Sequence, residues 1–160
     1  MNTKGIEALY QKIGSAVSAM IPEKWQRVML YAEVEEDRST VIFYYYTDEN
    51  NKPVYSLDIE DFPGIDKQYI NSLYDDLMEY IRSLWEEFRT QKQQVWSSLT
   101  MQLFNVGKFN IYFDYSEFDE SRINIVQRQM LWKYKNLGIQ PTHKADVDFL
   151  KKYLKKAQKI

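Results

Sequence analysis

Residues 28–46 read VMLYAEVEEDRSTVIFYYY, and this segment carries the clearest signal of the fold class. Apolar residues occupy every second position from Val28 to Val34, which is the spacing of a strand that buries one face. A polar turn over residues 35–38 follows, and Thr40 to Tyr46 reads as a second strand rich in aromatic side chains. Two such runs joined by a short polar turn predict an antiparallel hairpin.

The rest of the chain adds helices and strands on both sides of this hairpin. A helix is expected over about Lys4 to Ile21, because apolar residues recur at helical spacing and Pro22 disfavours helix in the residue before it. Downstream we expect a strand near 54–57, a long helix at 66–93, strands at 98–104 and 109–115, and helices at 123–136 and 143–156. The order αβββαββαα predicts an α+β fold, in which an antiparallel sheet from two strand runs packs with the long central helix and the C-terminal helices. The order of the strands in the sheet stays open.

Three positions predict where elements begin, turn or end. Asp66 is a candidate N-cap of the long helix. Gly107 supplies the permissive backbone that the turn of the second hairpin needs. Leu137–Gly138 is expected to cap the next helix, because Pro141 just beyond it prevents the helix from continuing.

Length and charge indicate a single domain with an uneven distribution of charge. We expect one domain over residues 1–160, of which 142–160 form a basic helical extension. Residues 1–120 carry 21 acidic and 11 basic side chains, whereas residues 121–160 carry 2 and 10. The chain has no cysteine, no secretory signal and no apolar run long enough to span a membrane, so we expect a cytoplasmic protein without membrane contact.

The sequence offers little for catalysis, and no catalytic, cofactor or metal site is predicted. His143 is the only histidine and is interpreted as a surface or capping residue. There is no nucleophile elbow, phosphate-binding loop or dinucleotide fingerprint. A hydrolase that holds a divalent metal through the Asp58–Asp61 cluster is the weakest interpretation, because no Asp-x-Lys or Glu-x-Lys triplet accompanies the carboxylates.

A cluster of acidic residues is the feature that calls for a function. Two hairpin turns and the strand-to-helix connection carry it, so we expect several of its residues to meet at one end of the sheet, edged by tyrosines. Such a surface could dock onto a basic protein surface, for example the DNA-binding groove of a nuclease. The same acidic surface would repel the phosphates of free nucleic acid. The predicted partner-binding residues are Glu33, Glu35, Glu36, Asp37, Asp48, Glu49, Asp58, Glu60, Asp61, Tyr44 and Tyr46.

Several short aromatic motifs are spread over most of the chain. They are Trp25, Tyr31–Val34, Phe43–Tyr45, a helix with Leu84 and Phe88, Trp96, the turn and strand at Gly107–Ile111, Tyr115, Arg128 and Trp132–Gly138. In the order and spacing of these motifs the chain resembles the YezG-like family of antitoxin (immunity) proteins of Gram-positive bacteria. The resemblance covers roughly residues 6–138.

The resemblance implies a protein without enzyme activity that neutralises a toxin, commonly a nuclease exported by type VII secretion. We therefore predict an immunity protein that binds a cognate toxin and occludes it directly. The alternative is a regulatory or interaction module whose basic C-terminal helix contacts nucleic acid or an acidic partner. The identity of the toxin and the oligomeric state stay open.

Overall fold

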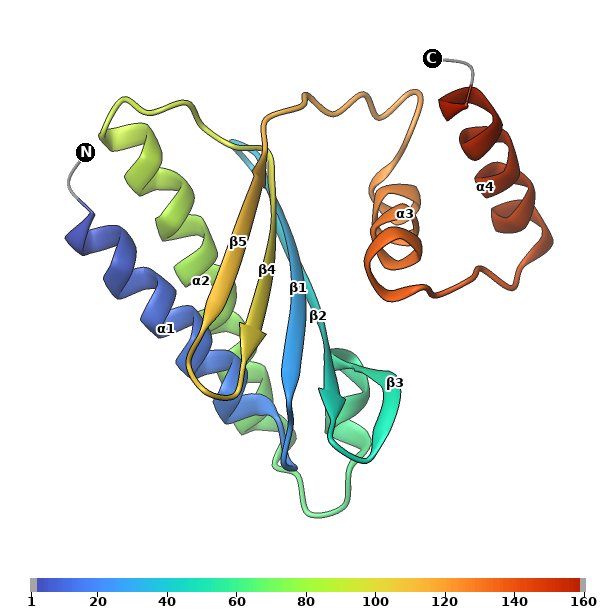
Figure 1. The fold of residues 1–160 in the computed structure, drawn as a ribbon. Helices are drawn as coiled ribbons and strands as arrows, with labels where there is room; N and C mark the ends of the chain where they lie inside the picture. Colours follow the sequence, from blue (N-terminus) through green and yellow to red (C-terminus); the bar gives the residue numbers. More distant parts are fainter. Residues whose placement is uncertain (1–2, 159–160) are drawn as a thin grey trace. The chain divides into compact units, whose positions relative to one another are not determined.

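A computed structural model describes residues 3–158, which form two compact units with a boundary after Glu117 (Figure 1). The first unit contains α1 (Lys4–Met20), β1 (Arg27–Val34), β2 (Ser39–Thr47), β3 (Asn50–Tyr55), the 3-10 helix η1 (Ser56–Asp61), α2 (Lys67–Thr90), β4 (Ser98–Phe104) and β5 (Phe109–Asp114). The second unit contains α3 (Ile125–Leu137) and α4 (Lys144–Ala157). The unit boundary therefore precedes α3, whereas the predicted C-terminal extension comprises only residues 142–160.

The first unit is an antiparallel sheet with the strand order β3-β2-β1-β4-β5. The predicted α+β class and element order are confirmed. The third strand was misplaced, because the chain forms strand from Asn50 through Pro53 to Tyr55 and then turns into η1. Proline is tolerated there because β3 lies at the edge of the sheet, where a missing N–H breaks no ladder bond on the outer side.

One face of the sheet and the two helices α1 and α2 enclose the core. Figure 1 shows the two helices side by side along that face. Alternate residues from neighbouring strands point toward the helices, so Leu30 lies between Phe43 of β2 and Met101 of β4. All three are at most 2% exposed, and burial of such side chains contributes roughly 1.5–3 kcal/mol each.

Helix α2 begins and packs as its sequence predicts. Asp66 caps it, because its side-chain Oδ1 accepts hydrogen bonds from the backbone N–H of Gln68 at 3.0 Å and of Tyr69 at 3.3 Å. The apolar stripe from Ile70 to Phe88 faces the core, and Trp85 beside it donates its indole N–H to the carbonyl of Trp96 at 3.0 Å. This stripe fixes which residues of α2 remain on the outside.

The second unit consists of two helices with well-defined ends. Asn124 and Gln127 form a capping box at the start of α3, each side chain accepting a hydrogen bond from the other's backbone N–H. Gly138 ends this helix in the left-handed conformation with φ of 69°, as predicted. Helix α4 lies within the predicted basic extension.

Candidate partner-binding surface

The turn between β1 and β2, residues 35–38, is held against α2 by two arginines. The guanidinium of Arg82 donates hydrogen bonds to the carbonyl of Glu35 at 2.6 Å, to the carbonyl of Glu36 and to the hydroxyl of Ser39 at 3.2 Å. Arg89, two turns further along α2, forms an ion pair with the Glu36 carboxylate at 2.8 Å. The turn is therefore part of the folded framework as well as an acidic surface.

These contacts reduce the negative charge that the turn presents. Glu35 pairs with Arg38 at 2.5 Å within the turn, and Glu36 pairs with Arg89. Asp37, at the tip, is exposed. Neither Arg82 nor Arg89 is among the residues predicted from the sequence to position this turn. Their spacing of seven residues, which brings them to the same side of a helix, was the available signal.

The second acidic turn lies at the opposite end of the sheet. Asp48 and Glu49 connect β2 to β3, and strand β2 separates them from the first turn by about 26 Å at the usual rise of a strand. Asp48 also lies 3.7 Å from the ammonium of Lys24. The expectation that the two turns meet at one end is wrong for Asp48 and Glu49, because consecutive turns of an antiparallel meander alternate between the ends of the sheet.

The 3-10 helix η1 carries more exposed carboxylates than either hairpin turn does among the predicted residues. Asp58, Glu60 and Asp61 are all exposed, while Ile59 between them is completely buried and anchors η1 to the core. Leu57 beside them is 55% exposed. This η1 surface, defined as Leu57, Asp58, Glu60 and Asp61, combines charge with an apolar contact point.

Three predicted site residues are buried. Glu33 is 3% exposed, and its carboxylate accepts a hydrogen bond from the hydroxyl of Tyr31 at 2.5 Å. Tyr44 stacks on Tyr55 with ring centroids 4.8 Å apart, and Tyr46 lies under the guanidinium of Arg27. The sequence VMLYAEV carries a single charged residue, which is typical of a strand buried on both faces and is the signal in the sequence for the burial of Glu33.

Burial also changes the chemistry of the phenol groups near η1. Burial raises the pKa of Tyr44 well above its ordinary value, and the neighbouring Tyr55 and Asp58 raise it further. Burial also raises the pKa of Tyr55, and the charge of Asp58 raises it further. Both phenols therefore keep their protons to a higher pH than a free tyrosine does.

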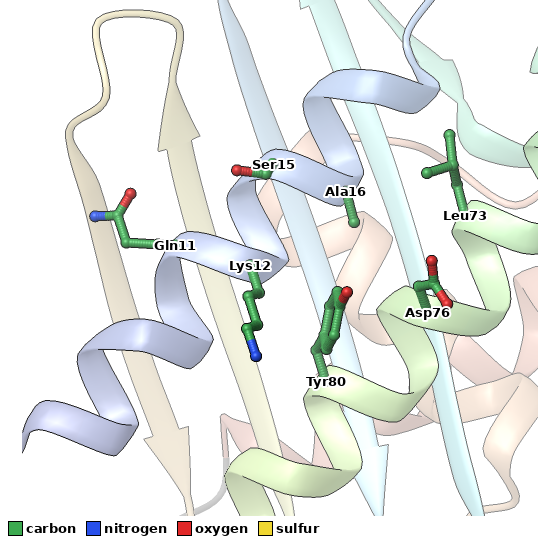
Figure 2. Close-up of a pocket in the computed structure, with 7 residues that line it drawn as sticks. All are labelled: Gln11, Lys12, Ser15, Ala16, Leu73, Asp76 and Tyr80. Carbon is green, nitrogen blue, oxygen red and sulfur yellow. The ribbon is translucent and has the colours of Figure 1, made fainter.

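A groove of about 310 Å³ lies between α1 and α2, and Figure 2 shows the residues that line it. Lys12 reaches toward Tyr80 of α2, with its ammonium 5.8 Å from the centre of the ring, and Asp76 and Leu73 lie further along the same helix. The lining contains one cation and one carboxylate and no nucleophile paired with a base. It has the character of a surface groove between helices.

Within residues 3–158 no group of three or more histidine, aspartate or glutamate side chains is placed to hold a metal ion. None of the helices described there has the length and apolar character needed to cross a membrane.

The YezG-like family, described as "Immunity protein YezG-like", matches the chain over residues 6–151. The chain belongs to this family. The match continues past Gly138 into α4, so much of the predicted extension falls within the family's own length.

Curated relatives agree with the family assignment. An immunity protein YezG from Bacillus spizizenii is 36% identical over 155 residues, which cover 97% of this chain and 96% of that protein. An immunity protein YezG from Bacillus subtilis is also 36% identical, over 93% of this chain and 99% of that protein. The type VII secretion system protein EsaG from Staphylococcus aureus is 25% identical over 91% of this chain and 90% of its own length.

Proposed function

We propose that this chain is an immunity protein that binds a cognate toxin and neutralises it by direct contact in the cytoplasm. Family membership carries the proposal, since the family and two full-length relatives are named immunity proteins. The name of the third relative associates the family with type VII secretion. Such a role requires a binding surface and no catalytic step.

We further propose that the toxin is a nuclease and that the η1 surface lies against its substrate groove. A nuclease must attract phosphates with basic side chains, so an acidic inhibitor surface is complementary to it. The first unit, residues 1–117, contains 19 acidic and 11 basic side chains, a net charge of −8. Within it the η1 surface supplies three exposed carboxylates and the exposed Leu57 as an apolar contact.

The partner should be identified first by capture. The tagged chain is expressed in its source cells, and the protein that co-purifies in equal amount is separated from it in denaturant and refolded. We expect that protein to degrade DNA or RNA and to lose this activity when the chain is added back. A captured toxin with another activity would contradict the nuclease assignment, and capture of nucleic acid in place of a protein would contradict the immunity role.

Charge reversal then tests the η1 surface. The triple variant Asp58→Lys, Glu60→Lys, Asp61→Lys should weaken binding to the captured toxin at least about ten-fold at low salt, and less at high salt because ions screen the attraction. The control is Asp75→Lys, Asp76→Lys, Glu79→Lys, which changes three exposed carboxylates of α2 and produces the same change in net charge. Equal weakening by the two variants, measured by surface plasmon resonance, would show that only overall charge matters.

The first hairpin turn needs a different variant. Charge reversal at Glu35 or Glu36 would break an ion pair within the chain. A loss of affinity could then come from a loss of stability, so these variants do not test binding alone. Asp37→Lys changes only the exposed tip of the turn. If the turn also contacts the toxin, Asp37→Lys should add to the effect of the η1 variant, whereas an unchanged affinity would exclude this turn from the interface.

The alternative function is contact with nucleic acid through α4. Lys151, Lys152, Lys155 and Lys156 of this helix are all exposed, which favours the alternative. It predicts binding of the purified chain to a DNA duplex, with an affinity that falls steeply as salt is raised. The immunity function does not require such binding, so fluorescence anisotropy with labelled DNA separates the two functions.

A further inference from the structure

The two edge strands of the sheet differ in how they are protected. At one edge β3 carries Lys52 and Pro53, a charge and a residue without a backbone N–H, which both discourage pairing with another strand. At the other edge β5 reads FNIYFD and contains neither lysine nor proline. An unprotected edge of this kind is a template for one more strand.

The backbone of β5 presents a defined row of hydrogen-bonding groups at this edge. The carbonyls of Lys108 and Asp114 accept hydrogen bonds from Phe104 and Ser97, so residues of even number direct their backbone groups toward β4. Along an antiparallel strand the backbone N–H and C=O groups of successive residues point alternately toward one neighbouring strand and away from it. The N–H and C=O groups of Phe109, Ile111 and Phe113 therefore point outward.

The side chains of β5 alternate between the core and the exposed face of the sheet. Phe109, Ile111 and Phe113 pack against the core, while Asn110, Tyr112 and Asp114 are exposed on the opposite face. Tyr112 is 63% exposed. Among the exposed large hydrophobic residues within 3–158, no other aromatic residue is as exposed. An added strand would cover it.

The sequence of β5 is complementary to itself when two copies run antiparallel about Ile111. In that register Ile111 faces Ile111 of the second copy, and Phe109 faces Phe113 of the second copy, which aligns all the outward backbone groups. Lys108 then faces Asp114 of the second copy, and the symmetric contact repeats the same pair. In a dimer with two-fold symmetry the same surface of each copy forms the interface, so that surface must be complementary to itself. In this register Lys108 of each copy faces Asp114 of the other, so opposite charges meet at both ends of the paired strands.

We propose that a second copy of this chain docks on β5, joining the two five-stranded sheets into one continuous antiparallel sheet. Six backbone hydrogen bonds form across the join, two for each facing pair of outward residues. Tyr112 lies beside Asn110 of the second copy on the exposed face. This self-association goes beyond the proposed toxin binding and does not depend on it.

The test is a charge swap measured by sedimentation velocity on the full chain, from about 1 µM to about 500 µM, the range in which small interfaces associate. We expect a monomer–dimer equilibrium for the native chain. Lys108→Asp alone and Asp114→Lys alone should each weaken the dimer about ten-fold, because like charges then face each other twice. The double variant Lys108→Asp, Asp114→Lys should restore the dimer.

Other results would overturn the proposal. A native chain that is monomeric over the whole concentration range would do so, and so would a dimer that both single variants leave intact. Failure of the double variant to recover a dimer, with circular dichroism showing an intact fold, would also contradict the pairing of Lys108 with Asp114.

The register has a separate test, because the chain contains no cysteine of its own. Facing residues of a strand pair lie within disulfide distance, so Ile111→Cys should form a dimer linked by a disulfide under mild oxidation. Val106→Cys, in the exposed turn before β5, is the control and should remain unlinked. Equal cross-linking of both variants would indicate random collision and contradict the register.

Discussion

Arg82 and Arg89 illustrate how two identical residues on one helix face can differ in their contribution to stability. Both lie over the ring of Trp85, at 5.1 and 5.5 Å from its centre. Arg82 is half-buried and donates to backbone carbonyls of the β1–β2 turn, whereas Arg89 is exposed and forms an ion pair with Glu36. Hydrogen bonds from a charged group to partly buried carbonyls are stronger than exposed ion pairs.

Arg82→Ala should therefore lower the free energy of unfolding by about 1–3 kcal/mol, because it removes a charged donor from the carbonyls of Glu35 and Glu36 and leaves Glu35 only the long 3.5 Å hydrogen bond from the backbone N–H of Arg38. Arg89→Ala is the matched control and should cost less than about 1 kcal/mol, an effect that salt reduces further. Urea unfolding of both variants measures the difference. Equal losses would mean that the stacking on Trp85, which the two arginines share, dominates.

At the scale of elements, the ends of α3 depend on local side chains that its sequence already specifies. Asn124 Oδ1 accepts a hydrogen bond from the N–H of Gln127 at 2.9 Å, and Gln127 Oε1 accepts one from the N–H of Asn124 at 3.0 Å. The two bonds satisfy N–H groups that have no partner within the helix.

Removing this cap should destabilise the first turn of α3. We expect Asn124→Ala to cost about 1 kcal/mol and to increase the exchange of the amide hydrogens of Gln127 and Arg128. Val126→Ala alters a 68% exposed residue in the same turn without touching the cap and should leave exchange unchanged. Hydrogen exchange localises the effect to α3. Similar protection in Asn124→Ala and the native chain would show that the cap is dispensable.

At the scale of the whole molecule, five tyrosines within residues 3–158 tie stability to alkaline pH. Burial is the first cause that raises the pKa of Tyr10, Tyr44, Tyr45, Tyr55 and Tyr74 in the folded state. The folded state keeps these phenols protonated at a pH where the unfolded chain has begun to ionise them. Above the unfolded pKa of about 10 the folded state binds more protons, so stability falls as pH rises.

The free energy of unfolding should thus be nearly constant between about pH 8 and about pH 9 and decline above about pH 10, by up to about 1.4 kcal/mol per pH unit for each extra proton bound. Tyr45→Phe removes one such phenol together with its 2.6 Å hydrogen bond to Glu23. This variant should be less stable at neutral pH and show a shallower alkaline decline. An unchanged slope in denaturant titrations would contradict the role of Tyr45.

The elements could be predicted because their signals are local. Asp66, Gly107 and Gly138 act on backbone within a few residues, and the strand preference of the apolar and aromatic residues of β1 depends only on its own side chains. The bounds predicted for the third strand were wrong because its signal is not local. A proline in β3 is acceptable only because the strand lies at an edge, and edge position depends on the arrangement of the whole sheet.

The candidate site was less predictable, since charge in a sequence does not reveal which carboxylates are paired. Glu33, Tyr44 and Tyr46 are buried, Glu35 and Glu36 have arginine partners, and Asp48 and Glu49 lie at the far end of β2. Arg89 is 53 residues from Glu36 in the chain, so no local pattern could have paired them. Their use in binding a toxin stays a prediction.

The order of helices and strands, the α+β class, the caps at Asp66 and Gly138 and the resemblance to a family of immunity proteins follow from the sequence alone. Hydrophobic spacing and backbone preferences act over short distances and can be read directly. Only the tertiary structure decided the strand order, the burial of the acidic and aromatic residues, and the exposure of η1 and of the β5 edge. These depend on contacts between residues far apart in the chain, whose energies are set by packing and by distance in space.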